Sequence, residues 1–255
     1  MEAQLSSFSF LYSPNMTETL RLAKRLASMI SCSRSEATRY IENGFVTVDG
    51  QVVEEPGFRV SPEQQIVLLP DANSDPVEAV TILLHKPAGY DVETDDGAVL
   101  KLITTENHVA DDHSGIHFIK RHLAALALVA PLGSQSSGLV VYTQDWRISR
   151  KLVSDAAKIE QEFVIEVKSD SVPDGLFLLN QGVEVKGKLI PVKASWQSEN
   201  KLRFAFKGIP RNQIVKLCEK AGLSVQSMKR IRLGRVPLSS LPAGQWRYLL
   251  KDELF

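Results

Sequence analysis

The chain has 255 residues, of which 44% are hydrophobic and 24% charged, and its 30 basic residues balance 30 acidic ones. This size and composition suit a globular protein with one large core, or one core and a small module, and no apolar run approaches the roughly 20 residues of a membrane-spanning helix. Only two cysteines occur, which excludes a disulfide framework or a zinc site of cysteines and favours the cytoplasm.

The N-terminal part predicts two short helices followed by a hairpin. Apolar residues recur at helical spacing from Leu22 to Ile30, which predicts the first helix. The sequence SRSE that begins at Ser33 fits a capping box and predicts a second helix over about 34–42. The alternating sequence FVTVDGQVV then contains Asp49-Gly50, a dipeptide that favours a type I′ hairpin turn.

Basic residues gather on these two helices, with only Glu36 opposing them. Such a cluster neutralises phosphates and releases counterions, so it predicts an RNA-binding surface. The predicted contacts are Arg21, Lys24, Arg25, Arg34, Ser35 and Arg39. The order of helices and hairpin resembles the alpha-L RNA-binding module, which implies a domain over residues 1–70 with its core at 18–68.

A connector rich in Pro, Asp, Asn and Ser follows at residues 71–79 and predicts a boundary before a second domain, 80–255. In the second domain, segments typical of strands recur as GLVVYT, QEFVIEV, VKASWQ and LRFAFKG. Segments typical of helices lie between them, as WRISRKLVSDAA and NQIVKLCEKAGL. Because strands and helices do not alternate regularly, the sequence predicts an α+β fold around a mostly antiparallel sheet.

The second domain resembles the RNA pseudouridine synthases of the RsuA type, closest to the RluF subgroup that modifies large-subunit ribosomal RNA. The resemblance rests on LLHKPAGY, on SSGLVVYTQD and on the long block that starts at Arg211 with RNQIVKLCEKAGL. It implies an isomerase that converts uridine to pseudouridine with one aspartate nucleophile, without a cofactor or a metal. It also implies structured RNA, most simply ribosomal RNA, as the partner of a monomeric protein.

The sequence departs from this family at its reactive positions. The family motif reads G-R-L-D, two variable residues, then T-S-G-L, and anchoring on Ser137-Gly138-Leu139 places Gly133 at the aspartate. Phe163 stands where a tyrosine packs on the target base, and Val215 stands where an arginine pairs with the aspartate. Glycine has no carboxylate to attack carbon, so we predict that the catalytic residues of the family are missing and that activity is lost or impaired.

Other residues retain the character of an RNA-binding protein. The resemblance and their charge predict RNA contacts at Lys86, Arg211, Asn212, Gln213, Lys216, Lys229, Arg230 and Arg232. Three functional alternatives stay open: a synthase with an unusual pocket, a non-catalytic RNA-binding or ribosome-assembly factor, and a protein-interaction module. Asp111, Asp112 and Asp145 are the candidates for a displaced nucleophile, and the histidines near 108–117 match no metal-ligand spacing.

Overall fold

The computed structural model describes residues 19–90, 96–168 and 175–255. These residues form two compact units, which divide between Val77 and Glu78 except that Ile119–Arg121 belong with the first. In the part of the chain that is described, no helix is both long and apolar enough to cross a membrane.

The first unit contains two helices and short strands. The helices are α1 (Leu22–Ile30) and α2 (Arg34–Glu42), and the strands are β1 (Leu20–Arg21), β2 (Val46–Val48), β3 (Gln51–Val52), β4 (Arg59–Val60) and β5 (Ile66–Leu68). Ser33 and Glu36 form the predicted capping box at the start of α2. Asp49 and Gly50 have φ of 51° and 82°, as the predicted hairpin turn requires. The predicted helices and hairpin are therefore confirmed.

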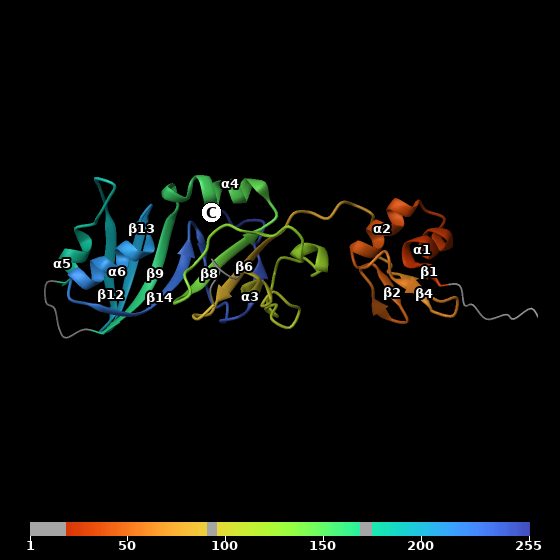
Figure 1. Ribbon diagram of the computed structural model, residues 1–255, viewed down its shortest axis with the longest axis horizontal. Coiled ribbons are helices and arrows are strands. Elements are labelled where there is room, and N and C mark those ends of the chain that lie inside the picture. Colours follow the sequence, from red (N-terminus) through yellow and green to blue (C-terminus); the bar gives the residue numbers. More distant parts are fainter. Residues whose placement is uncertain (1–18, 91–95, 169–174) are drawn as a thin grey trace, which may run out of the picture. The chain divides into compact units, whose positions relative to one another are not determined.

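The second unit is built on one large sheet. Its strands are β6 (Thr81–Lys86), β7 (Ala127–Leu128), β8 (Ser136–Thr143), β9 (Glu160–Lys168), β10 (Val183–Val185), β11 (Lys188–Ile190), β12 (Val192–Ser198), β13 (Lys201–Lys207), β14 (Ser224–Leu233), β15 (Val236–Pro237) and β16 (Trp246–Tyr248). Its helices are α3 (Asp96–Leu100), α4 (Trp146–Ser154), α5 (Gly175–Asn180) and α6 (Arg211–Lys220), with 3₁₀ turns η1 (Lys120–Leu123) and η2 (Ala156–Lys158). Helix α5 lies beside β12 at one end of the sheet (Figure 1).

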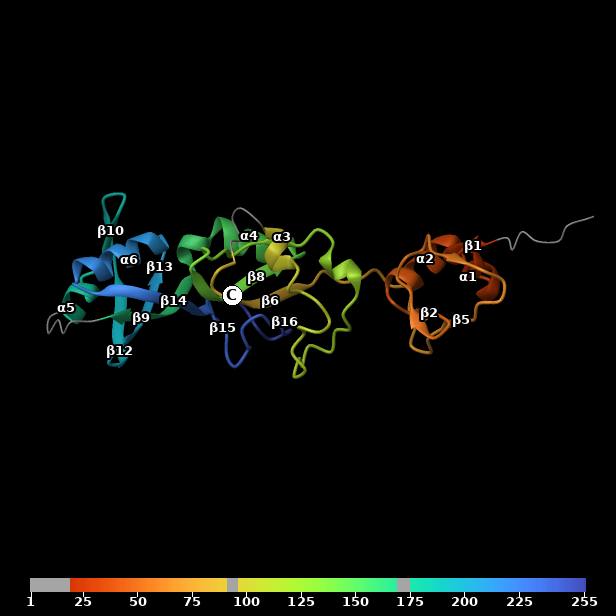
Figure 2. The same ribbon diagram turned by 60° about the horizontal axis from the view of Figure 1, so that its bottom comes forward.

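Among the described residues, the strand order of this sheet is β12-β13-β9-β14-β8-β6-β16, with β7 and β15 paired at its side. In Figure 2, β12 lies toward one end of the sheet and β16 toward the other. The pairs along this path are antiparallel except β8 with β14, which run parallel. The prediction of an α+β fold around a mostly antiparallel sheet is confirmed.

Strand β8 lies in the middle of the sheet and is buried on both faces. Val140 and Tyr142 belong to one hydrophobic core, whereas Leu139 and Val141 belong to another, against which Leu152 of α4 packs. A strand that is packed on both faces of the sheet has a well-defined position in the fold. It therefore holds the segment that precedes it, residues 130–135, in one place.

Candidate functional site

The segment before β8 enters the sheet through a glycine that no other residue can replace without strain. Gly138 has φ of +108°, and a Cβ on it would lie 2.3 Å from the carbonyl oxygen of Arg230. The contact is close because β8 runs parallel to β14 here, with Gly138 opposite Arg230. The glycine of the S-S-G-L motif thus serves the packing of two strands.

The Arg230 side chain anchors the segment from β14. It is 3% exposed, and its guanidinium donates hydrogen bonds to the carbonyl oxygens of Leu139 and Ala130 and to Oε1 of Gln161, the first at 2.8 Å and the last at 3.1 Å. A buried cation needs such acceptors, since unpaired charge inside a protein is costly. The arginine therefore fastens both ends of the segment 130–139 through main-chain oxygens.

Lys86, at the end of β6, anchors the middle of the same segment. Its side chain is fully buried, and Nζ donates to the carbonyl oxygens of Pro87, Tyr90 and Ser134 at 2.9, 2.8 and 3.3 Å. The prediction that Lys86 and Arg230 contact RNA is corrected here, because burial and these hydrogen bonds make both residues part of the scaffold.

The three substituted family positions lie in different surroundings. Gly133 is partly exposed in a turn, where its carbonyl oxygen accepts from the amide of Ser136 at 3.0 Å. Phe163 is fully buried and stacks on Phe206 with ring centroids 5.5 Å apart. Val215 is half-buried on α6. In this structure the ring of Phe163 is covered by the core, so it presents no open face to a base.

An apolar hollow of about 240 Å³ adjoins the loop. It is lined by Val129, Ala130, Pro131, Leu152, Ala156, Ile159, Gln161, Ile209, Pro210, Arg230 and Leu233. The hollow brings Pro131, at the position of the family arginine, together with Pro210, the N-cap of α6. Gly133, Phe163 and Val215 are not among the residues that line it.

The first unit carries a basic groove of about 530 Å³, called the helix groove below. It is lined by Thr19, Leu20, Arg21, Ala23, Lys24, Arg34, Thr38, Pro56, Gly57 and Arg59. The structure thus gathers Arg21, Lys24 and Arg34, whereas Arg25, Ser35 and Arg39 lie outside this lining. Sequence reasoning missed Arg59, which β-pairing sets opposite Arg21.

Known proteins resemble this chain over most of its length. Residues 20–66 match the S4 domain family. Dual-specificity RNA pseudouridine synthase RluF of Escherichia coli (strain K12) is 28% identical over 249 residues, covering 92% of this chain and 77% of that protein. Ribosomal small subunit pseudouridine synthase A of the same organism is 24% identical and covers 92% of this chain and 98% of that protein. The chain is therefore similar to these pseudouridine synthases over 92% of its length.

A solved structure agrees with this relationship in fold. A pseudouridylate synthase crystal structure superposes with a TM-score of 0.56 at 21% identity, covering 91% of this chain and 97% of that one. The two units therefore have the architecture of an S4 domain and a pseudouridine synthase domain.

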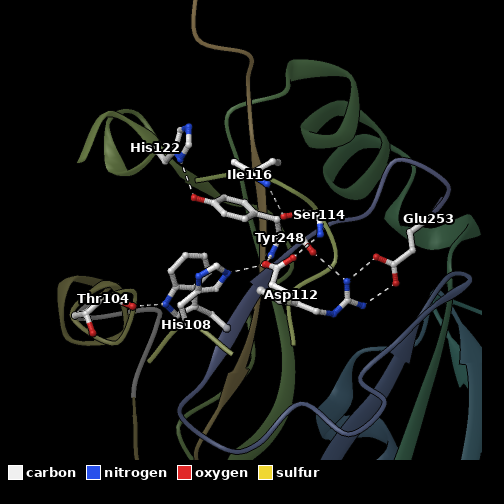
Figure 3. A network of polar contacts seen from close by, with 10 residues as sticks. Thr104, His108, Asp112, Ser114, Ile116, His122, Tyr248 and Glu253 are labelled. Atoms are coloured by element: carbon white, nitrogen blue, oxygen red, sulfur yellow. Dashed lines mark hydrogen bonds and ion pairs between the residues drawn. The ribbon is translucent and has the colours of Figure 1, made fainter. Parts of the chain in front are cut away.

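Asp112, one of the acids predicted as a displaced nucleophile, precedes the loop before β8 in the chain and lies in a polar network shown in Figure 3. Its carboxylate accepts hydrogen bonds from the amides of Ser114 and Tyr248 at 2.8 and 2.9 Å, and His108 Nε2 lies 2.6 Å away. Burial acts to raise the pKa of Asp112, but the hydrogen bonds from Tyr248, His108 and Ser114 outweigh it and leave the pKa below its usual value.

The same network is closed by His122 and Tyr248 (Figure 3). His122 Nδ1 lies 2.7 Å from the Tyr248 hydroxyl, and both side chains are buried. His108 stacks on Trp246 at 4.1 Å, and the Trp246 indole donates to the carbonyl oxygen of Thr104. The network ties residues 104–122 to β16, which indicates a structural role. Among the described residues, no group of three His, Cys, Asp or Glu side chains could hold a metal ion.

Asp111 and Asp145 also have structural partners. Asp145 is the N-cap of α4, where its carboxylate accepts from the amide of Arg147 at 2.7 Å. Asp111 forms a surface pair with His113, and its side chain is 84% exposed. Neither acid resembles a carboxylate held in a dry pocket for attack on a base.

The remaining predicted RNA contacts of the synthase domain differ in exposure. Asn212 and Lys216 are exposed on α6, and Gln213 and Lys229 are partly exposed. Arg232 bonds to Glu162 Oε2 at 2.7 Å and to Glu160 Oε1 at 2.6 Å, so its charge is already matched. The Arg211 side chain lies outside the described part of the structure.

Proposed function

We propose that this protein binds structured ribosomal RNA and does not isomerise uridine. The observation that carries the proposal is Gly133 at the family's aspartate position, since a glycine offers no nucleophile. The relatives named above are RNA pseudouridine synthases, so RNA is the ligand that the shared domains suggest. A role as a ribosome-assembly or RNA-chaperone factor follows, in the cytoplasm and as a monomer.

The other substitutions support the loss of chemistry. An arginine that pairs with the aspartate would become an unpaired buried charge once the aspartate is gone, and removing one partner of such a pair costs about 3–5 kcal/mol. Val215 relieves that cost. Phe163 lacks the hydroxyl of the family tyrosine and is covered by Phe206. Three positions of one reaction have thus changed in a mutually consistent way.

None of the three candidate acids supplies a substitute with the right surroundings. Asp112 is bound on both oxygens, Asp145 caps a helix, and Asp111 is a solvated surface group. Within the described residues, we therefore assign no nucleophile.

The helix groove is the proposed primary RNA contact. Four cations, Arg21, Lys24, Arg34 and Arg59, line it, and no acid is among the lining residues. Such a surface binds phosphates irrespective of base sequence, so the affinity falls steeply with salt. We further propose domain bounds of 1–70 and 80–255, joined by residues 71–79.

The catalytic part of the proposal is tested by tritium release from carbon-5 of labelled uridine in ribosomal RNA. Wild type should release none above background, because loss of a nucleophile removes on the order of a million-fold in turnover. Gly133→Asp alone should remain inactive, since Val215 supplies no cation to pair with the new carboxylate. Gly133→Asp combined with Val215→Arg is the variant expected to recover turnover, with Phe163→Tyr as an addition. Turnover by wild type at ordinary enzyme rates would overturn the proposal.

The binding part is tested by measuring affinity for structured ribosomal RNA fragments against salt. Arg34→Ala with Arg59→Ala removes two groove cations and should flatten the log-log salt slope by about two units. Arg25→Ala with Arg39→Ala removes the same charge outside the groove lining and serves as the matched control. Equal losses in both variants would place the contact on the wider helix surface, and RNA binding by wild type that ignores salt would refute it.

A further inference from the structure

The synthase domain carries a second basic groove, on the side of the sheet that α4 covers. This groove has a volume of about 440 Å³ and is called the α4 groove below. It is lined by Lys151, Asp155, Lys158, Ile159, Glu160, Lys207, Arg232, Gly234, Arg235 and Phe255. Five cations and two acids thus surround an apolar floor that includes Ile159.

The two acids of the α4 groove are already matched by two of its cations. Asp155 Oδ1 lies 2.7 Å from Lys158 Nζ, and Glu160 Oε1 lies 2.6 Å from Arg232 Nη2. The pKa of Glu160 is held below its usual value chiefly by the hydrogen bond from Arg232. Lys151, Lys207 and Arg235 are exposed, and within the described residues no ion pair engages them. The groove lining therefore has more basic than acidic side chains, and three of its cations are exposed without an ion pair among the described residues.

The α4 groove and the apolar hollow beside the loop share one lining residue. Ile159 lines both, and neighbouring residues of α4 and η2 divide between them, with Lys151 on the groove side and Leu152 on the hollow side. The hollow in turn reaches Pro131 at the position of the family arginine. A chain of nucleotides that left the loop could follow this path, with apolar surface under its bases and cations along its side.

Helix α4 adds an aromatic platform beside this path. The Trp146 side chain is 65% exposed, and the Arg147 guanidinium lies 5.7 Å from its ring centroid. Arg147 and Lys151 are four residues apart and so share one side of the helix, which leads from the indole toward the α4 groove. Tryptophan is highly buried on average, and an exposed aromatic ring beside a cation is a surface on which unpaired bases can stack.

We infer that a single-stranded RNA segment binds along α4, with phosphates at Arg147, Lys151, Lys207 and Arg235 and bases on Trp146 and over Ile159. This inference rests on the proposed RNA-binding function and adds to it a second contact, in the synthase domain. Single-stranded RNA suits the surface better than a duplex, because stacked base pairs would leave the indole and the apolar floor without partners. An acidic peptide would use the cations alone.

The test compares charge-matched variants with a single-stranded 12-nucleotide RNA of mixed sequence. Lys151→Ala, Lys207→Ala and Arg235→Ala together should weaken binding by about 100-fold near 0.1 M salt and flatten the salt slope by about two units. The matched control removes Lys188, Lys201 and Lys220, which are exposed elsewhere in the same domain, and should change affinity by less than about threefold. Trp146→Ala should weaken binding by about 5- to 100-fold with an unchanged salt slope, because it removes stacking and no charge.

Crosslinking of wild-type protein gives a readout that does not depend on variant folding. RNA carrying 4-thiouridine should crosslink to the peptide that contains Trp146 or Ile159. One outcome would overturn this inference alone: the α4 triple variant matches its control, and no such crosslink forms. If the helix-groove variant Arg34→Ala/Arg59→Ala still loses affinity for RNA in that case, the proposed function stands. If wild type binds neither structured nor single-stranded RNA, both this inference and the proposed function are wrong. Loss of polyglutamate binding by the triple variant, with RNA binding intact, would assign the surface to an acidic protein partner instead.

Discussion

The buried pair of His122 and Tyr248 should make the synthase domain sensitive to mild acid. His122 is 4% exposed, and burial, with a smaller effect from nearby His117, lowers its pKa to about 4. The unfolded chain would take up this proton at the ordinary value of 6.5. The contribution of neutral His122 to stability is therefore complete above pH 6.5 and is lost as the pH falls from 6.5 to about 4.

The size of the effect follows from the pKa difference. One pKa unit corresponds to about 1.4 kcal/mol, so the loss across this window is about 3 kcal/mol. That is a large share of the about 5–15 kcal/mol that stabilises a typical domain. The carboxylate of Asp112, with its lowered pKa, adds a further loss below pH 4, as its hydrogen bonds from Ser114 and Tyr248 are broken by protonation.

Urea unfolding at pH 7.0 and pH 4.5, followed by tryptophan fluorescence, measures the effect. The comparison is with His122→Phe/Tyr248→Phe, which removes the titrating ring and its hydroxyl partner together and so leaves no buried polar group unpaired. Wild type should lose about 2.4 kcal/mol more than this variant between the two pH values, because the full loss is reached only below pH 4. Equal losses in the two proteins would show that His122 is not held neutral by burial, and would refute the argument.

Three further outcomes are expected. Gly138→Ala should lower the free energy of unfolding of the synthase domain, measured in urea, by more than about 3 kcal/mol. The control Gly244→Ala, which is also at positive φ but has open space around it, should cost only about 1–2 kcal/mol. Similar values for the two variants would contradict the close strand contact. Cys218 is buried, and burial raises the pKa of its thiol to about 12. A thiol reagent at pH 8 should therefore modify Cys32 readily and Cys218 only when the protein unfolds. Rapid modification of both cysteines in the folded protein would argue against the burial of Cys218. Limited proteolysis should cut first within 71–79, and first cleavage inside either domain would argue against the proposed boundary.

Local features of the fold were predictable because they depend on neighbouring residues. The capping box of Ser33 and Glu36 and the turn at Asp49-Gly50 need only short-range geometry, and both are present. The antiparallel character of the large sheet followed from the irregular order of strands and helices, whereas the parallel pairing of β8 with β14 did not, since residues about a hundred positions apart form it.

The surroundings of charged residues were less predictable, because a sequence does not show which main-chain oxygens lie nearby. Lys86 reads as a surface cation, yet its ammonium is buried among three carbonyl groups. Arg59 carries no local signal for RNA binding and joins the helix groove only through the pairing of β1 with β4. The Asp112 network likewise depends on β16, which lies more than a hundred residues further along the chain.

The anchoring of the loop by Arg230 and Lys86 has an evolutionary consequence. Both cations hold carbonyl oxygens, which every amino acid supplies, so these hydrogen bonds do not depend on the identity of the loop's side chains. Mutations at Pro131, Gly133 or Gln135 can therefore accumulate without unfolding the domain. A lineage can lose its chemistry at this loop while keeping the protein abundant, and a protein engineer can use the same positions to install new side chains on an unchanged frame.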